Sequence, residues 1–301
     1  MDHKRGLRVA EEYQSLQTRA CTIVEQAEET TKFDHNEWNK EIGSGNSAVL
    51  QEGKKIEKAA INFSKVSGVY TEEMAKSAGM KPGKFFATGI SSILHPRSPM
   101  VPIIHMNVRY FELEDGASWF GGGIDLTPHY IDKKEAAWFH QQLKTVCDRF
   151  DLSYYPDYKK QADDYFFLSH RNETRGVGGI FFDHLQPKNN EDFEKLLSFT
   201  KALAKLYPEL YAAILKNKSE LPFTEREKQW QSLRRGRYVE FNLLHDRGTK
   251  FGLDSGGNTE SILLSMPPMA IWKYQFEPEP GSAERETLNG LKKEIDWIHQ
   301  K

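Results

Sequence analysis

The chain has 301 residues, of which 38% are hydrophobic, and a formal net charge of -2 at pH 7. This hydrophobic content is enough for a sizeable core, and the lack of a basic excess argues against nucleic-acid binding, which favours a positively charged surface. A near-neutral total still permits an acidic small substrate, because a few local arginines can create a positive site.

The chain carries two cysteines, Cys21 and Cys147, which lie far apart and form no C-x-x-C pair. Two cysteines are too few for a zinc ribbon, an iron–sulfur cluster or a disulfide scaffold. They are typical of reduced thiols in a cytosolic protein. Residues 1–5 lead into a charged amphipathic segment without the apolar stretch of a signal peptide. No apolar run approaches the ~20 residues that a membrane span needs. We therefore expect a cytoplasmic protein with no membrane span and no nucleic-acid partner.

The first third of the chain predicts a helix followed by strands. Apolar residues recur at three- and four-residue steps over residues 5–30, which indicates a helix within an N-terminal segment 1–35. Residues 43–46 are rich in glycine and predict a turn between two short strands. Further strands are expected over residues 84–94 and 103–113, separated by a proline-containing loop in which a helix is excluded.

The middle of the chain is expected to be mainly helical. Residues 119–123 end in three glycines, which predict a break before a short strand that contains Asp125. The apolar spacing that follows predicts helices over residues 133–150, 157–171 and 190–217.

The last third of the chain completes an α+β pattern. Thr224 and Glu227 match a capping box, and the helix that they begin is expected to end near Arg234. Strands are then expected over residues 237–245 and 259–266, and a C-terminal helix over residues 283–300, within segment 280–301. Helices and strands do not alternate regularly, so we expect one α+β domain over residues 1–301, with a large, mainly antiparallel sheet flanked on both faces by helices.

The strand predicted over residues 103–113 is the first candidate for a functional site. Side chains alternate between the two faces of a strand, so His105, Asn107 and Arg109 share one face and the intervening apolar residues share the other. Three such polar residues suggest the floor of a wet pocket. The alternative is an ordinary antiparallel strand with one solvated face.

A second candidate lies in residues 234–248, which are rich in arginine. If this segment is a strand, Glu240, Asn242 and Asp246 lie on one face. Asp246 beside Arg247 is then a carboxylate positioned in a pocket, or alternatively part of a surface ion pair at a turn.

Glycine clusters and histidines carry weaker signals. The glycines of residues 121–123, 176–179 and 256–257 match no nucleotide-binding motif and are typical of tight turns. Four histidines could hold a divalent metal, but their spacing matches no metal motif, and His140 lies on the apolar side of its predicted helix, as a core histidine does.

Several long motifs occur in one order along the chain. They are Glu57-Lys58-Ala59-Ala60-Ile61-Asn62-Phe63-Ser64, Trp119-Phe120-Gly121-Gly122-Gly123-Ile124-Asp125-Leu126-Thr127-Pro128, His170-Arg171-Asn172-Glu173, Arg175-Gly176-Val177-Gly178-Gly179-Ile180-Phe181-Phe182-Asp183, residues 234–249, Thr259-Glu260-Ser261-Ile262-Leu263 and Ser265-Met266-Pro267-Pro268. Together the matches run from residue 53 to residue 275, and they resemble the oxygen-dependent coproporphyrinogen III oxidases.

The resemblance implies a fold, a reaction and an assembly. The fold is a large antiparallel sheet between helices, paired as a homodimer through an interface around residues 238–273. The reaction converts coproporphyrinogen III and two O₂ into protoporphyrinogen IX, two CO₂ and two H₂O₂, without an organic cofactor. Such a substrate carries four propionates on an apolar macrocycle, so its site needs cations among flat apolar walls and must exclude bulk water.

The resemblance also assigns roles by position in these motifs. Asp246 resembles the carboxylate that faces the pyrrole nitrogens, His105 the proposed proton donor, and Arg247 the cation beside Asp246, and these three are the predicted catalytic residues. The predicted substrate-binding residues are Ser91, Asn107, Val108, Arg109, Arg237, Gly256, Gly257 and Asn258. The predicted ligands of a possible divalent metal are His95, His105, His140 and His170.

Two departures from the family pattern concern propionate binding. Residues 256–258 read Gly-Gly-Asn, where the family usually ends this motif in arginine, and Asn258 offers no charged fork to a carboxylate. Residues 43–48 are less rich in glycine than usual, and Ala48 stands where members carry an arginine. We expect a weaker or differently aimed propionate contact at these positions.

Two other functions compete with this interpretation. A non-catalytic tetrapyrrole-binding protein of the same fold is the main one, and the presence of Asp246, Arg247 and the motif of residues 175–183 argues against it. A hydrolase that uses histidine-bound metal is a weaker alternative.

Overall fold

The frame of the molecule is a seven-stranded antiparallel sheet. The computed structural model describes residues 4–70, 72, 82–254 and 258–299. The strand order is β1-β2-β3-β4-β5-β6-β9. The strands are β1 (Asp34–Lys40), β2 (Gly43–Gln51), β3 (Ile56–Tyr70), β4 (Gly83–Pro96), β5 (Ile103–Leu113), β6 (Ser118–Thr127) and β9 (Gly178–Leu185). A separate two-stranded sheet is formed by β7 (Phe167–Leu168) and β8 (Glu173–Thr174).

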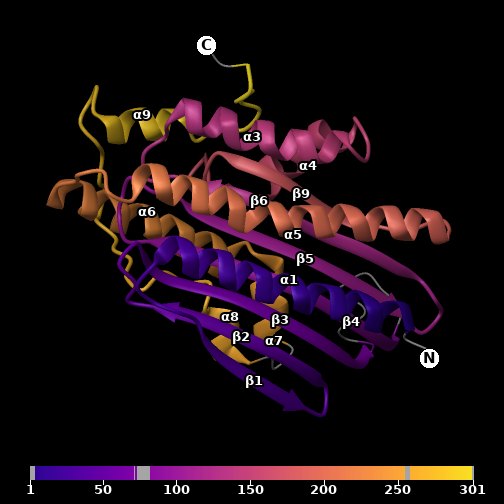
Figure 1. The fold of residues 1–301 in the computed structure, drawn as a ribbon. Coiled ribbons are helices and arrows are strands. Elements are labelled where there is room, and N and C mark those ends of the chain that lie inside the picture. The colour runs from indigo at the N-terminus through magenta and orange to yellow at the C-terminus, as the bar shows by residue number, and fades with distance from the viewer. Residues whose placement is uncertain (1–3, 71, 73–81, 255–257, 300–301) are drawn as a thin grey trace.

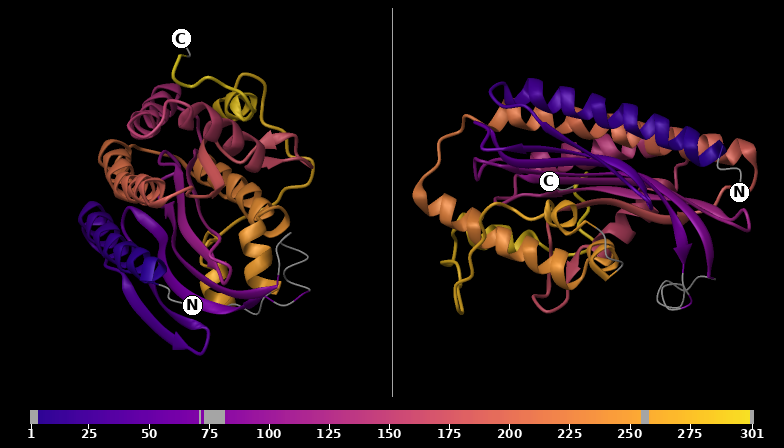
Figure 2. Two further views of the ribbon diagram at one scale, coloured as in Figure 1. Left: turned by 90° about the vertical axis from the view of Figure 1, so that its right-hand side faces the viewer. Right: turned by 90° about the horizontal axis from the view of Figure 1, so that it is seen from below.

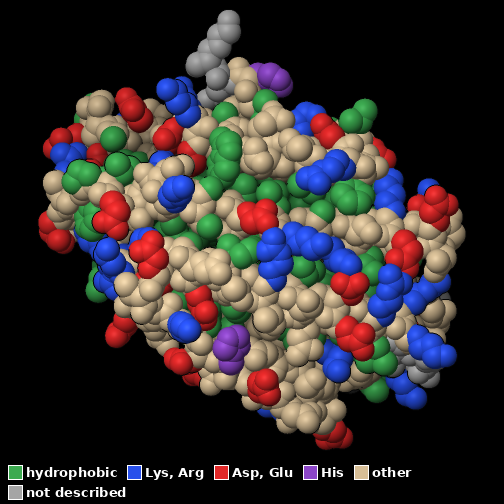
Figure 3. Space-filling model, in the orientation of Figure 1, with side chains coloured by type: hydrophobic (Ala, Val, Ile, Leu, Met, Phe, Trp, Pro, Cys, Tyr) green, Lys and Arg blue, Asp and Glu red, His purple; other side chains and the backbone are tan. Residues whose placement is uncertain are grey.

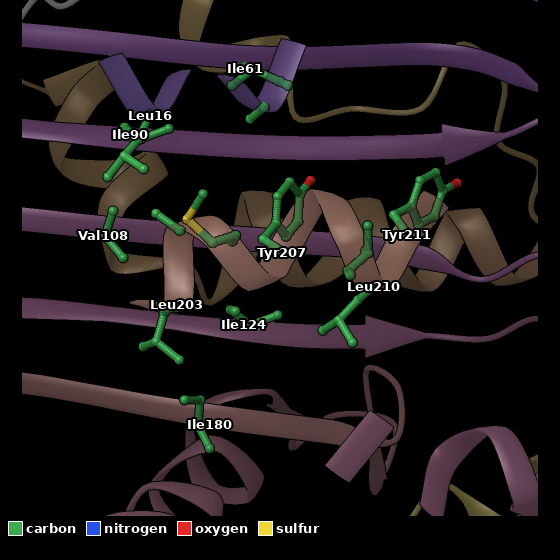
Figure 4. Close-up of a cluster of buried hydrophobic side chains, with 14 of the residues drawn as sticks. Leu16, Ile61, Ile90, Val108, Ile124, Ile180, Leu203, Tyr207, Leu210 and Tyr211 are labelled. Atoms are coloured by element: carbon green, nitrogen blue, oxygen red, sulfur yellow. The ribbon is translucent and has the colours of Figure 1, made fainter. Parts of the chain in front are cut away.

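One face of the sheet is covered by a helical layer that encloses the main core. The layer contains α1 (Lys4–Glu28), α3 (Lys133–Asp148), α4 (Tyr154–Tyr165) and α5 (Asn190–Lys218). Figure 4 shows side chains of α5 and of the central strands pointing toward one another, among them Tyr207, Val108 and Ile124. Close approach is also built into α1, because a Cβ on Gly6 would lie 2.6 Å from the ring of Phe86. On the outer side of this layer, Lys and Arg alternate with Asp and Glu (Figure 3).

The other face of the sheet is covered by helices that follow α5 in the chain. Its helices are α6 (Glu225–Leu244), α7 (Arg247–Asp254) and α8 (Thr259–Leu263), and the chain ends beyond α9 (Ala283–Gly290). Figures 1 and 2 show the sheet lying between α1 and α5 on one side and α6 to α8 on the other. Tyr238 of α6 packs on Ala60, Ile93 and Ile103, which form a small second core on this face. Within the described residues, no helix has both the length and the apolarity that crossing a membrane requires.

The structure confirms the expected fold class and several elements. The sheet is antiparallel and has helices on both faces, as an α+β protein was expected to have. The helices predicted over residues 5–30, 133–150 and 190–217 and the strands over 84–94 and 103–113 are present with shifts of a few residues at their ends.

The prediction for residues 234–266 is wrong. Residues 237–244 continue helix α6 instead of forming a strand, with His245 as the C-cap, and residues 259–266 begin with helix α8. Four of the buried residues in this part of α6 are Arg or other polar residues, so the sequence shows no apolar period there. The buried residues are Arg234, Arg235, Gly236, Tyr238, Glu240, Phe241 and Asn242. Glu240, Asn242 and Asp246 therefore do not share a strand face.

Glycine led to two further errors. Residues 119–123 lie inside β6, and residues 43–46 lie inside β2, so neither segment is a break or a turn. In β6 the glycines allow the backbone of β5 to lie close, because a Cβ on Gly122 would lie 2.5 Å from the carbonyl oxygen of Asn107 on that strand.

The remaining differences concern the extent and existence of elements. Helix α4 ends at Tyr165, because residues 167–174 form the β7–β8 pair, and helix α9 ends at Gly290. Strands β3 and β9 were not predicted as full strands. Both have glycine or polar residues among their apolar ones, which weakens a two-residue alternation.

Candidate active site

The face of the sheet under α6 to α8 carries the predicted polar residues in rows across the strands. In β5, His105, Asn107 and Arg109 are partly exposed, and the residues between them are buried in the main core, as predicted. In the strand register, His105 pairs with Asp125 of β6, and Asn107 pairs with Ser91 of β4. We call this surface the site face.

His105 belongs to a chain of charged contacts. Its Nδ1 lies 2.8 Å from Oδ1 of Asp125, and Nη2 of Arg175 donates to Oδ2 of Asp125 over 2.6 Å. The guanidinium of Arg175 is also surrounded by the rings of Phe166, Tyr238 and Phe241, at 4.3 to 4.7 Å.

Asp125 is therefore the fixed negative charge of the site. Burial alone would raise the pKa of its carboxyl, but the charge of Arg175 and the hydrogen bond with His105 outweigh burial and lower the pKa. A charged Asp125 holds the His105 ring at Nδ1, so a proton given to a bound molecule would leave from Nε2.

Asp246 lies where α6 ends and α7 begins. Its Oδ1 accepts a hydrogen bond of 2.7 Å from the Tyr165 hydroxyl, and its Oδ2 accepts one of 2.7 Å from the backbone N–H of Thr249. The guanidinium of Arg247 lies 5.2 Å from the centre of the Tyr165 ring. The second hydrogen bond is that of a helix cap, so Asp246 has a structural role as well as a possible chemical one.

Tyr165 connects Asp246 to the sheet. Its ring stacks on that of Phe181 at 4.1 Å, and Phe181 pairs with Gly123 beside the Asn107 row. Burial and the nearby charge of Asp246 raise the pKa of the Tyr165 hydroxyl, which therefore stays protonated and can donate to Asp246. Phe166, the next residue, packs edge-on against His105 with ring centres 6.4 Å apart. Aromatic rings thus form a wall between His105 and Asp246.

The floor of the site also holds acceptors without protein donors. Oδ1 of Asn62 and Oδ1 of Asn107 are buried, and the described residues offer neither of them a hydrogen-bond partner. Asn62 pairs with Ser91, so these amides lie on adjacent positions of β3 and β5, either side of β4. Buried acceptors of this kind need water or a ligand that carries N–H groups.

The structure separates some of the predicted substrate-binding residues from this floor. Arg237 donates to Glu240 over 2.9 Å, so it is engaged within helix α6. The side chain of Val108 is fully buried in the core on the opposite face of the sheet. Asn258 is exposed and directly precedes α8, and Gly256 and Gly257 lie outside the described residues.

Ala48 does not lie on the site face. It is fully buried in the main core on the α1 side, so its side chain has no path to a propionate. The substitution at this position therefore does not alter a contact of the site face.

The four predicted metal ligands are not gathered together. His140 is buried between the Tyr155 hydroxyl and the carbonyl oxygen of Val177, at 3.0 and 2.9 Å, and burial lowers its pKa to about 4. His95 contacts the carbonyl oxygen of Ser265, whereas His105 and His170 contact carboxylates. In the described part of the chain, no three His, Cys, Asp or Glu side chains are placed to hold one metal ion. Each imidazole of the predicted four-histidine site thus has a different neighbour in this structure.

Sequence reasoning did not assign roles to Asp125, Arg175, Tyr165 or Asp183. Asp125 and Arg175 stand within two of the motifs that carried the resemblance, and Asp183 ends the second of these. The signal was therefore present, but the pairing depends on the register between β5, β6 and β9. Asp183 contacts Arg109 at 2.7 Å, which shows the same dependence.

Fold and site define an α+β protein whose sheet carries a cation-containing site with aromatic walls, suited to a large ligand with carboxylates. A family model described as coproporphyrinogen III oxidase matches residues 8–297. The chain belongs to this family.

Curated relatives agree with that assignment. The chloroplastic oxygen-dependent coproporphyrinogen-III oxidase of Nicotiana tabacum is 45% identical over 299 residues, which cover 94% of this chain and 75% of the relative. Coproporphyrinogen-III oxidase 1, chloroplastic, of Arabidopsis thaliana is 45% identical over 300 residues, which cover 94% of this chain and 77% of the relative. The oxygen-dependent coproporphyrinogen-III oxidase of Francisella philomiragia is 43% identical over 297 residues, which cover 94% of this chain and 95% of the relative.

Proposed function

We propose that this chain catalyses the oxygen-dependent conversion of coproporphyrinogen III to protoporphyrinogen IX in haem biosynthesis. The observation that carries the proposal is the match over residues 8–297, together with a site face that presents His105 and Arg109 beside an aromatic wall. A non-catalytic tetrapyrrole-binding role is not favoured, because the relatives that match are oxidases by name.

The chemistry balances with O₂ as the oxidant. Each reacting propionate loses CO₂ and one hydrogen, a vinyl group forms, and O₂ takes up two electrons and becomes H₂O₂. A propionate that reacts as its carboxylate needs one further proton for each H₂O₂ formed. The two electrons leave the side chain by way of its electron-rich pyrrole, so the protein has to orient the substrate and move protons.

Two residues are suited to moving those protons. Asp246 is proposed as the base near a pyrrole N–H, and the hydrogen bonds from Tyr165 and Thr249 orient its carboxylate. His105 is proposed as the proton donor through Nε2, because Asp125 engages Nδ1. Arg247 beside Tyr165 supplies positive charge that stabilises a carboxylate of the substrate.

Substrate binding is assigned to the floor and its rim. Ser91, Asn107 and Arg109 lie on the site face, and Asn107 offers a buried acceptor to a pyrrole N–H. Gly256, Gly257 and Asn258 remain proposed contacts from the family pattern, with a neutral amide in place of the usual arginine. Arg237 is proposed to stabilise helix α6 through its hydrogen bond to Glu240, and not to contact the substrate.

Assembly and location are also part of the proposal. A homodimer through residues 238–273 is supported by exposed apolar side chains on that stretch, which include Leu244, Met269 and Trp272. A cytoplasmic location is supported by Cys21 and Cys147, which are free, buried thiols with no disulfide partner in the described chain.

The test is turnover of coproporphyrinogen III by the purified protein in air and under argon. We expect CO₂ release and, after oxidation of the product, protoporphyrin fluorescence in air, with neither under argon. A parallel reaction with a chelator tests a divalent metal, and equal rates would remove the metal from the proposal. Tight binding of coproporphyrinogen without CO₂ release would instead establish the non-catalytic alternative.

A further inference from the structure

The remote end of the site face contains a β-bulge that changes the direction of a histidine. In the pairing of β6 with β9, two residues, Asp183 and His184, oppose the single residue Gly121. His184 has a φ of 54°, in the left-handed region that non-glycine residues rarely adopt. A bulge commonly re-aims a side chain, and strained residues of this kind cluster at functional sites. The extra residue lets Asp183 contact Arg109 and His184 contact Trp119.

His184 is the last member of a row of four stacked rings. Phe85 of β4, Phe111 of β5, Trp119 of β6 and His184 of β9 follow in that order, with ring centres 5.3, 4.6 and 5.2 Å apart and interplanar angles of 7°, 24° and 11°. We call these four residues the aromatic row. Their neighbours along β4, β5 and β6 are in the main core, so the row lies on the site face; these neighbours are Phe86, Tyr110 and Phe120.

Between His105 and the aromatic row, the site face includes positions without side chains. At the end near the row it presents hydrogen-bond donors. Phe111 lies six residues beyond His105 on β5, a distance of about 20 Å. Opposite Arg109, β4 and β6 contribute Gly89 and Gly121, which have no side chain. A Cβ on Gly121 would lie 2.7 Å from the Asp183 carboxylate and 2.9 Å from Nε of Arg109, so glycine makes room for this ion pair.

Asp183 holds two donors together at this end. Its Oδ2 lies 2.7 Å from Nη2 of Arg109 and 3.5 Å from Nδ1 of His184. A single carboxylate engages only part of the donor capacity of a guanidinium and an imidazole. The side chain of His184 is 59% exposed, so its ring is accessible to a ligand that lies on the floor.

We propose that His184 and Arg109, oriented by Asp183, bind a propionate that the reaction leaves intact, while the aromatic row packs against the pyrrole that carries it. This inference rests on the proposed function, in which His105 donates a proton at the reacting end of the substrate. A tetrapyrrole with extended propionates is comparable in length to the floor, so its remote carboxylates reach the bulge. Charge-assisted hydrogen bonds at the end of an apolar wall favour substrates that carry this carboxylate over substrates that lack it. His184 is therefore a specificity-determining residue, and Asp183 is a positioning residue.

The test compares two substrates in the His184→Asn variant. Asparagine tolerates the left-handed backbone of the bulge but lacks the ring. The substrates are coproporphyrinogen III and a porphyrinogen in which ethyl groups replace the two propionates that do not react. We expect the KM of coproporphyrinogen to rise about tenfold, as for the loss of a hydrogen bond to a charged group, with kcat within twofold. The KM of the diethyl compound should stay unchanged. The matched control is His299→Asn, at an exposed histidine near the C-terminus, which should leave both constants unchanged.

The outcomes separate this inference from the proposed function. Equal KM values for coproporphyrinogen in wild type and His184→Asn, with active wild type, would overturn the role of His184 and leave the oxidase function intact. An equal rise for both substrates would also overturn it, because the loss would not depend on the remote carboxylates. No turnover of either substrate by the wild type would refute the proposed function itself.

Discussion

At the scale of single residues, Asp246 has two roles that a pair of substitutions can separate. An asparagine side chain in its place would keep an acceptor for the N–H of Thr249 but could not act as a base, whereas alanine loses both functions. We expect Asp246→Asn and Asp246→Ala to abolish turnover, and only the alanine variant to lose about 1 kcal/mol of unfolding free energy. The measurements are protoporphyrin formation in air and urea unfolding.

A matched control for this pair exists in α3. Asp132 caps that helix by accepting from the N–H groups of Lys134 and Glu135, on the other face of the sheet from Asp246. Asp132→Asn should leave activity unchanged. If Asp246→Asn retains activity within a few-fold of wild type, Asp246 is a helix cap alone and the proposed base must be sought elsewhere.

The residue scale also shows what the sequence could predict about the site. The shared face of His105, Asn107 and Arg109 followed from the two-residue period of a strand, and the structure confirms it. The contact of Asp125 with Arg175 could not be predicted, because these residues are 50 positions apart and meet only through the pairing of β6 with β9 and the packing of α6. Periodicity describes one element at a time, and such contacts depend on several.

At the scale of elements, α6 shows how buried polar residues can conceal a helix. The sequence predicts its capping box, but Arg234, Arg235 and Asn242 occupy buried positions in its second half, so no apolar period indicates a helix there. Arg235 donates to the carbonyl oxygen of Pro96, and Asn242 to that of Tyr238. These tertiary and local hydrogen bonds offset the burial of polar groups, and no hydrophobicity pattern reveals them.

Glu240 of α6 joins three segments of the chain. Its carboxylate accepts from Arg171 in the β7–β8 connection, from Arg237 in its own helix and from Nε1 of Trp272, at 2.7 to 2.9 Å. It also lies 2.9 Å from Nε2 of His170. Burial would raise the pKa of Glu240, but these donors and the arginine charges lower it to about 2.

This lowered pKa predicts a pH-dependent contribution to stability. A carboxyl whose folded pKa is below its unfolded value of 4.5 stabilises the fold above pH 4.5, and the contribution is lost as the pH falls toward 2. Glu240→Gln should therefore lower the unfolding free energy by about 2 kcal/mol at pH 7, with a difference from wild type that shrinks below pH 4.5. Thermal unfolding between pH 7 and pH 3 measures this.

The control for Glu240 is a surface carboxylate of similar type. Glu220 forms an exposed ion pair with Lys54 at 3.4 Å, so Glu220→Gln should change stability by less than about 1 kcal/mol at any pH. A constant difference between Glu240→Gln and wild type across the pH range would mean that packing, not charge, explains the effect of Glu240.

At the scale of the whole molecule, the two faces of the sheet serve different ends. The α1–α5 side holds the main core, which Figure 4 shows between strands and α5, and its outer surface carries mixed charges (Figure 3). The α6–α8 side holds the site face and a stretch with large exposed apolar residues. They are Leu243, Leu244, Leu253, Met269 and Trp272. A protein that remains a monomer rarely exposes so many within one short stretch of chain.

This asymmetry leads to a prediction about the assembly. A second copy that covers residues 238–273 would bury these side chains, and it would also fix the corner between α6 and α7 that carries Asp246. We therefore expect wild type to sediment at twice the 34.7 kDa chain mass at micromolar concentration. Leu244→Glu should shift it to monomer and lower kcat, because the corner loses its support. Leu152→Glu, at a residue that is 74% exposed between α3 and α4, is the control and should stay dimeric and active. A monomeric wild type, or equal dissociation of both variants, would show that this face is not the interface.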